Sequence, residues 1–160
     1  MTNVDFFRDF AADTTSKTNA YYFEHSRETL DFSNLFDADS AEDDQLKIFH
    51  FTDSIEVELN EAGDLVVGVK YSGKILALIK SDLDETVDTQ KNTKSEDGKY
   101  EKRVKELIED GGIIAEIIAF NNCDTTYDKE ISFSDLQEVY NMFDWNGDGV
   151  WFNYEIVISV

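Results

Sequence analysis

The sequence predicts an α+β protein: an antiparallel β-meander with N-terminal helices and a C-terminal helical unit. The prediction rests on the hydrophobic period, which is helical near the start of the chain, two residues between 46 and 80, and helical again after residue 100. The chain has 160 residues, 41% of them hydrophobic, which is not typical of a disordered protein. This length suits one compact domain or two small units that share a core.

The N-terminal region is expected to begin with a short amphipathic helix over residues 3–12, where the apolar side chains fall at helical spacing. The aromatic stretch after it is expected to cover one side of the core. Residues 37–45, DADSAEDDQ, combine five acids with no turn glycine, so they are expected to form a solvated loop.

Residues 46–80 predict four antiparallel strands, because they are rich in β-branched and aromatic residues with a period of two. The alternation is clearest in SIEVELN at 54–60. The breaks are NEAGD and YSGK, and in the second we expect Ser72 and Gly73 to form a two-residue hairpin turn, since glycine tolerates a positive φ.

The rest of the chain predicts a linker and then helices. Residues 81–99 contain few apolar groups and are expected to be a linker or mobile loop between an α+β region at 1–80 and a helical unit at 100–160. Gly111 and Gly112 are expected to divide the first apolar run of that unit into two helices, because glycine is a poor helix former.

Charge restricts the partners of this chain. It carries 35 acids and 14 bases, for a formal net charge of −21. Such a field repels nucleic acid and anionic membranes and attracts cations and basic proteins. The alternative interpretation of the charge is high solubility or a salty habitat.

A metal-binding pattern lies near the C-terminus, in FDWNGDGVWFNYE at 143–155. Calcium prefers six to eight oxygen ligands, which a short loop supplies with alternating side chains, a glycine turn and a closing glutamate. Every element of D-x-[DN]-x-[DN]-G-x5-E is present. The candidate ligands are Asp144, Asn146, Asp148, the backbone carbonyl of Val150, and Glu155.

This pattern resembles the EF-hand family over roughly the last forty residues. The apolar face of SFSDLQEVYNMF, at 132–143, suits the helix that enters such a loop. The resemblance implies calcium in the loop and bidentate ligation by Glu155. The final residues IVISV are typical of a strand rather than of the exiting helix of the family, so a sensor-type opening is not expected.

A second, degenerate loop is expected at 124–135, with Lys129 in the place of the glycine. One helix would have to leave this loop and enter the next. Two arrangements stay open: a compact loop–helix–loop unit with two ions, or one true site with a degenerate partner. The candidate ligands are Asp124, Thr126, Asp128, Glu130 and Asp135.

Other features are weaker. Parts of 30–85 are similar to the strand-rich segments that follow calcium-binding nonapeptide repeats in secreted bacterial proteins, which hints at a bacterial origin. Cys123 is expected to be a buried structural thiol, and no nucleophile elbow, phosphate loop or zinc cluster is present, so enzymatic activity is not expected. The N-terminus lacks a secretory leader, which favours the cytoplasm or leaderless export.

Two functions follow as hypotheses. The first is a calcium-binding protein with a structural or modest sensor role. The alternative is an acidic inhibitor or immunity-type protein that binds a basic protein partner, for which the net charge of −21 would make association fast and sensitive to salt.

Overall fold

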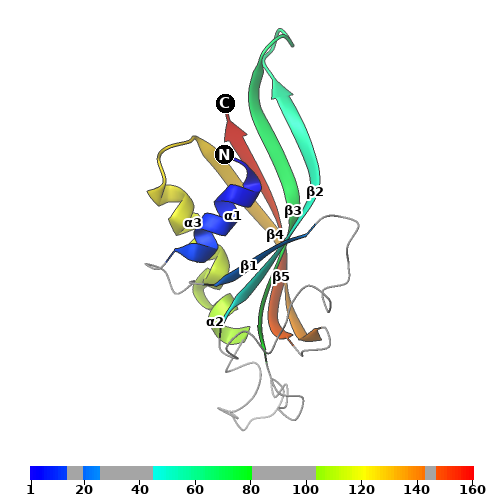
Figure 1. The fold of residues 1–160 in the computed structure, drawn as a ribbon, viewed down its shortest axis with the longest axis vertical. Coiled ribbons are helices and arrows are strands. Elements are labelled where there is room, and N and C mark those ends of the chain that lie inside the picture. Colours follow the sequence, from blue (N-terminus) through cyan, green and yellow to red (C-terminus); the bar gives the residue numbers. More distant parts are fainter. Residues whose placement is uncertain (14–19, 26–44, 81–103, 143–146) are drawn as a thin grey trace.

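A computed structural model describes residues 1–13, 20–25, 45–80, 104–142 and 147–160. The described residues form a mixed sheet with helices on one side (Figure 1). In chain order the elements are α1 (Asn3–Ala12), β1 (Tyr21–His25), β2 (Lys47–Leu59), β3 (Val66–Lys80), α2 (Lys105–Ile108), the 3-10 helix η3 (Glu109–Gly111), α3 (Gly112–Cys123), β4 (Lys129–Met142) and β5 (Gly147–Ser159).

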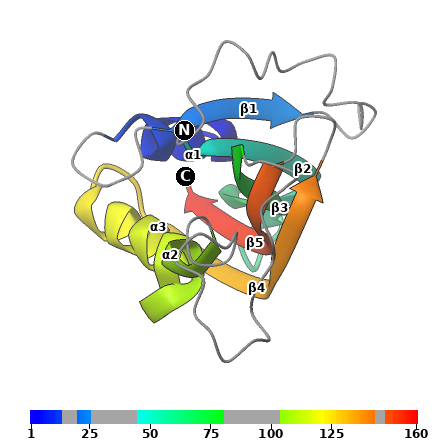
Figure 2. The ribbon, with the colours of Figure 1, turned by 90° about the horizontal axis from the view of Figure 1, so that it is seen from below.

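The sheet has the strand order β1-β2-β3-β5-β4. Neighbouring strands are antiparallel except β1, which runs parallel to β2. The sheet curves around α1, α2 and α3, which all lie on its inner face (Figure 2). Because β3 pairs with β5, the described parts of residues 1–80 and 100–160 share one sheet and one core.

The predicted C-terminal helical unit is wrong. Residues 129–142 form strand β4, and β5 follows it. The apolar residues of SFSDLQEVYNMF do fall at helical spacing, but pairing with β5 supplies the backbone with hydrogen-bond partners that a local pattern cannot reveal. Register shifts bend the strand beside Asp135 and Asn141, whose φ angles are 57° and 53°, and these irregularities disturb the expected period of two.

The predicted four-stranded meander is also wrong, because residues 47–80 form one long hairpin of two strands. The turn at NEAGD is confirmed: Asn60 Oδ1 accepts hydrogen bonds from the backbone of Asp64 and Leu65. The predicted turn at Ser72 and Gly73 lies instead in the middle of β3. A Cβ on Gly73 would come within 1.9 Å of the Phe51 carbonyl oxygen, so the glycine permits close packing.

Two helical predictions are confirmed. Helix α1 begins at Asn3 behind a capping box, in which the Thr2 hydroxyl accepts from Asp5 N and the Asp5 carboxylate accepts from Thr2 N. These hydrogen bonds lower the pKa of Asp5. The first apolar run after residue 100 is broken at Gly111 and Gly112, as predicted, and these glycines have φ angles of 84° and 47°.

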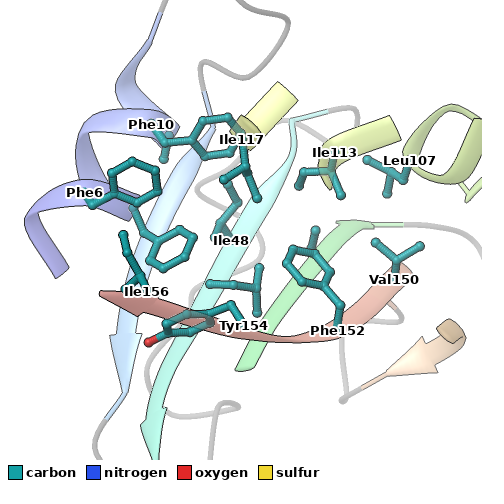
Figure 3. Packing of buried hydrophobic residues seen from close by; sticks show 14 of the residues in the cluster. Phe6, Phe10, Ile48, Leu107, Ile113, Ile117, Val150, Phe152, Tyr154 and Ile156 are labelled. Atoms are coloured by element: carbon teal, nitrogen blue, oxygen red, sulfur yellow. The ribbon is translucent and has the colours of Figure 1, made fainter. Parts of the chain in front are cut away.

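The core lies between the three helices and the inner face of the sheet (Figure 3). Helix α1 contributes Phe6, Phe7 and Phe10, all fully buried, and α3 adds Ile113 and Ile117. The matching side chains of the sheet alternate along β5, and they are Val150, Phe152, Tyr154, Ile156 and Ile158. A smaller cluster on the outer face comprises Phe49, Phe51, Leu76 and Leu78.

The close approach at Gly73 yields a stability prediction. Gly73→Ala should lower the free energy of unfolding by about 3 kcal/mol, because backbone must move to admit the methyl group. Gly68→Ala, in the same strand, is the matched control: its nearest neighbour is the end of the flexible Glu58 side chain at 3.2 Å. Urea denaturation measures both variants, and equal stability losses would contradict the packing role of Gly73.

Candidate functional site

The hairpin of β2 and β3 projects beyond the rest of the fold (Figure 1), and we call its residues 54–71 the hairpin arm. Large apolar side chains are unusually exposed on it. Six of the eleven such side chains among the described residues lie there. They are Ile55 at 61%, Val57 at 58%, Leu59 at 53%, Leu65 at 63%, Val66 at 47% and Val67 at 44%.

The arm is amphipathic across its two faces. Ile55 and Val57 pair with Tyr71 and Val69, so they extend the apolar inner face of the sheet beyond the helices. Glu56 and Glu58 point to the outer face. The arm carries four acids and one base, so an apolar surface is bordered by negative charge.

The single base of the arm, Lys70, is paired across the outer face. Its Nζ lies 3.0 Å from Glu155 Oε1, and this hydrogen bond raises the pKa of Lys70. The Ser72 hydroxyl donates to the same carboxylate oxygen at 3.5 Å. Pairing of its only base leaves the arm with an excess of negative charge.

Two adjoining hollows of about 400 and 300 Å³ cross the outer face beside the arm and share Ser132 and Glu155. Their charged lining is mainly acidic, and it consists of Asp53, Glu58, Lys70, Lys74, Glu130 and Glu155. The uncharged lining is mixed, and it consists of Ser72, Gly73, Ile131, Ser132, Phe133, Ser134, Asn153, Tyr154 and Val157. Such an open surface, with mainly acidic charges, suits contact with a basic group rather than enclosure of a small apolar ligand.

Among the predicted calcium ligands near the C-terminus, the described acids Asp148 and Glu155 point to opposite faces of β5. Asp144 and Asn146 lie outside the described residues, and the others lie on strand β5. Asp148 faces inward, is fully buried, and accepts a hydrogen bond from Asn141 N at 2.8 Å. Glu155 faces outward and lies seven residues further on, roughly 23 Å along an extended strand. The described residues therefore do not fit one twelve-residue calcium loop.

Val150, whose backbone carbonyl is a predicted calcium ligand, has a fully buried side chain. Its backbone belongs to the ladder, where it pairs with Ala77 of β3 and Glu138 of β4. A carbonyl engaged in a sheet is not presented inside a loop, so this residue gives no support to a loop-type site.

In the degenerate loop at 124–135, a lysine ammonium group lies beside the first candidate ligand, Asp124. Lys129, with a side chain only 1% exposed, donates from Nζ to the Asp124 carboxylate at 2.7 Å and to its carbonyl at 3.2 Å. This hydrogen bond, with help from Thr126 N, lowers the pKa of Asp124 to about 2. The ammonium thus satisfies the first carboxylate of the proposed ion site.

The remaining predicted ligands of this loop are dispersed. Thr126 and Asp128 are exposed in the turn, whereas Glu130 and Asp135 lie in β4. Asp135 accepts a hydrogen bond from the Asn153 amide at 2.8 Å. Within the described ranges, no group of three or more histidine, cysteine or acidic side chains is arranged to hold a metal ion.

The structure also contains a buried polar network around His50, which the sequence did not single out. His50 is fully buried; its Nδ1 lies 2.7 Å from the Tyr22 hydroxyl and its Nε2 lies 2.5 Å from the Tyr154 hydroxyl. Asn3 donates to Tyr154 at 2.9 Å and to Thr52 at 2.7 Å. The only sequence signal was that His50 shares its face of the strand with Ile48.

The network joins helix α1 to strands β1, β2 and β5. Its contacts are satisfied when Tyr154 donates to Nε2 and the neutral imidazole donates from Nδ1 to Tyr22. Burial lowers the pKa of His50 to about 3 and raises the pKa of Tyr154 to about 12. A neutral, enclosed histidine of this kind stabilises packing.

Cys123 corrects another prediction. It was expected to be buried, but it is exposed at the end of α3, whereas His50 lies inside the sheet. Cys123 is the last residue of α3, and the buried side chains of this helix, Ile113 and Ile117, lie earlier in it. The described structure does not bring Cys123 and His50 together as a catalytic pair.

No protein-family model and no curated protein sequence matches this chain. Across the described part of the chain, no helix combines the length and the apolar character needed to cross a bilayer.

The His50 network predicts a pH effect on stability. The unfolded histidine, with a pKa near 6.5, binds a proton that the folded one does not bind above about pH 3, so stability falls as pH decreases through this window. Between pH 7.5 and 5 we expect His50 to contribute a loss of about 2 kcal/mol. His50→Gln should show a correspondingly smaller loss in urea denaturation at the two pH values. Identical pH dependence in both proteins would contradict the assignment.

Calcium binding itself stays a prediction, and the geometry sharpens its test. Glu155→Gln should leave any calcium affinity of the wild type unchanged, because Glu155 points away from Asp148 across the sheet. Isothermal titration calorimetry measures both proteins. If the wild type binds calcium and Glu155→Gln abolishes this binding, the expectation is wrong and Glu155 is a calcium ligand of the predicted loop.

Proposed function

We propose that this protein is an acidic binding protein of the inhibitor or immunity type, which occupies a basic surface on a partner protein. The observation that carries the proposal is the hairpin arm, with exposed Ile55 and Val57 on one face and Glu56 and Glu58 on the other. Exposed apolar surface bordered by polar groups is typical of protein interaction sites.

The two faces of the arm supply different parts of such an interaction. Burial of Ile55, Val57 and their neighbours against a partner removes apolar surface from water, which provides affinity. The acids of the arm and of the outer face attract a basic partner and repel acidic proteins, which provides fast association and selectivity. The net charge of −21 acts in the same direction over a longer range.

Calcium is a weaker second candidate, and the sequence pattern at 144–155 is what favours it. The structural observations support the protein-binding function better, because the arm presents its exposed side chains together while Asp148 and Glu155 point to opposite faces of the sheet. The two functions differ in one measurable respect: docking through the arm requires no metal ion.

The proposed function predicts that the double variant Ile55→Thr/Val57→Thr loses partner binding. Threonine keeps the β-branched shape that suits a strand but removes apolar contact, so affinity should fall by about 30-fold. The protein is immobilised in buffer that contains a chelator, and the proteins that it retains from lysate of the source cells are identified. Each retained protein is then purified, and its affinity for the wild type and for the variant is measured at low and at high salt. We expect a basic protein whose affinity weakens with salt.

The matched control is Leu136→Thr, which alters an exposed apolar side chain of the same sheet away from the arm. It should bind like the wild type, and circular dichroism should show that every variant is folded. Retention of only acidic or neutral proteins, an absolute need for calcium, or equal binding by the arm variant would each overturn the proposal.

A further inference from the structure

We propose that the hairpin arm captures its partner by strand addition, and that the free edge of β2 accepts an extended segment of alternating apolar and basic residues. This inference rests on the proposed function and assigns its binding mode and the chemistry of the segment recognised. An incoming strand would pair with the backbone of Ser54–Leu59 and extend the sheet beyond β1.

Within the described ranges, β1 covers only the first part of the edge of β2. Strand β1 pairs with β2 only from Tyr21 opposite Lys47 to His25 opposite Phe51. Strand β2 continues to Leu59, and among the described residues this second half pairs only with β3. An unpaired strand edge presents a row of backbone donors and acceptors, which is a template for another strand.

The edge between Ser54 and Glu58 carries only part of the usual protection against pairing. Natural edges are commonly blocked by lysine, proline or a bulge. The stretch SIEVEL at 54–59 contains no lysine or proline, and its register with β3 is continuous from Ser54 to Glu58, with register shifts on either side, at Thr52/Ser54 and at Glu58/Leu59. At the other side of the sheet, β4 is likewise interrupted by register shifts, beside Asp135 and Asn141. Its apolar side chains Ile131 and Phe133 are only partly exposed, so more exposed apolar side chains distinguish the edge of β2.

The same side chains specify the incoming segment. On the inner face its neighbours would be Ile55 and Val57, which are about 60% exposed and favour valine, isoleucine or an aromatic residue. On the outer face its neighbours would be Glu56 and Glu58, which favour lysine or arginine. A second copy of this chain would place glutamates opposite glutamates and bring together two bodies of charge −21, so a basic partner fits better.

A synthetic strand tests the inference directly. The probe is a labelled heptapeptide of alternating lysine and valine, Lys-Val-Lys-Val-Lys-Val-Lys, with Glu-Val-Glu-Val-Glu-Val-Glu as its charge control, and binding is followed by fluorescence anisotropy. We expect the lysine peptide to bind the wild type and the glutamate peptide not to bind. Glu56→Lys/Glu58→Lys should weaken binding by about tenfold or more.

The matched control for charge is Glu106→Lys/Glu109→Lys, which makes the same change in net charge at exposed positions of α2 and η3. It should retain binding to within about threefold, since distant exposed charges are largely screened by salt. Equal loss in both variants would show that only the overall field attracts the peptide and would overturn the edge assignment.

Backbone pairing is tested with two further versions of the lysine–valine peptide. One is methylated at the backbone amide nitrogens of its lysines, and the other at the backbone amide nitrogens of its valines. Successive N–H groups of a strand point to opposite sides, so only one set can pair with β2, and the affinities should differ by about tenfold. Equal binding by both methylated peptides, or no binding by any peptide, overturns strand addition.

The outcome for the captured protein separates this inference from the proposed function. If binding of the basic protein captured from lysate still depends on Ile55 and Val57, the proposed function survives; if it does not, the proposed function and strand addition both fail. Dimers of the free chain that Ile55→Thr/Val57→Thr dissolves in analytical ultracentrifugation would identify a second copy as the occupant and overturn the proposal.

Discussion

The antiparallel pairing of β3 with β5 joins the two halves of the chain, and the other features of the fold depend on it. The ladder runs from Gly68 opposite Ser159 to Lys80 opposite Gly147. It brings Tyr154 over Gly73, where a side chain would not fit, and so delivers the tyrosine hydroxyl to His50. The same register points every second residue of β5 at the helices, which creates the inner core.

The register also separates side chains that the sequence places in one loop. Because a strand alternates its faces, Asp148 points into the protein and Glu155 points out beside Lys70. A calcium loop needs the opposite arrangement, in which a curled backbone aims its oxygens at one centre. The ladder bonds of β5 with two neighbours hold this backbone extended.

Charge and apolar surface are distributed unevenly over the molecule. The helices and the sheet bury Phe6, Phe7 and Phe10 completely, while Ile55 and Val57, only a few residues beyond Thr52 and its contact with Asn3, stay exposed. An apolar surface that is left open costs solubility, and the surrounding acids counteract this cost through like-charge repulsion between copies. Negative charge thus opposes contact between the arms of two copies of this chain.

The sequence alone determined the features that depend on neighbouring residues. These are helix α1 with its capping box, the turn that begins at Asn60, the helix break at Gly111 and Gly112, and the net charge of −21. Each follows from local hydrogen bonding, backbone freedom or composition, which a short window of sequence contains. The period of two at 54–60 likewise indicated a strand, and β2 contains all of this stretch except Asn60.

Only the tertiary structure decided how the segments pair and which surfaces are covered. Residues 129–142 have the apolar spacing of a helix and become a strand, because β5 offers them backbone partners. Ile55 and Val57 have the alternation of a buried strand and remain exposed, because the described helices end short of the arm. The hairpin arm could not be identified as a candidate site from the sequence for the same reason. Burial and strand pairing depend on elements distant in sequence, and a local pattern carries no information about where those elements lie.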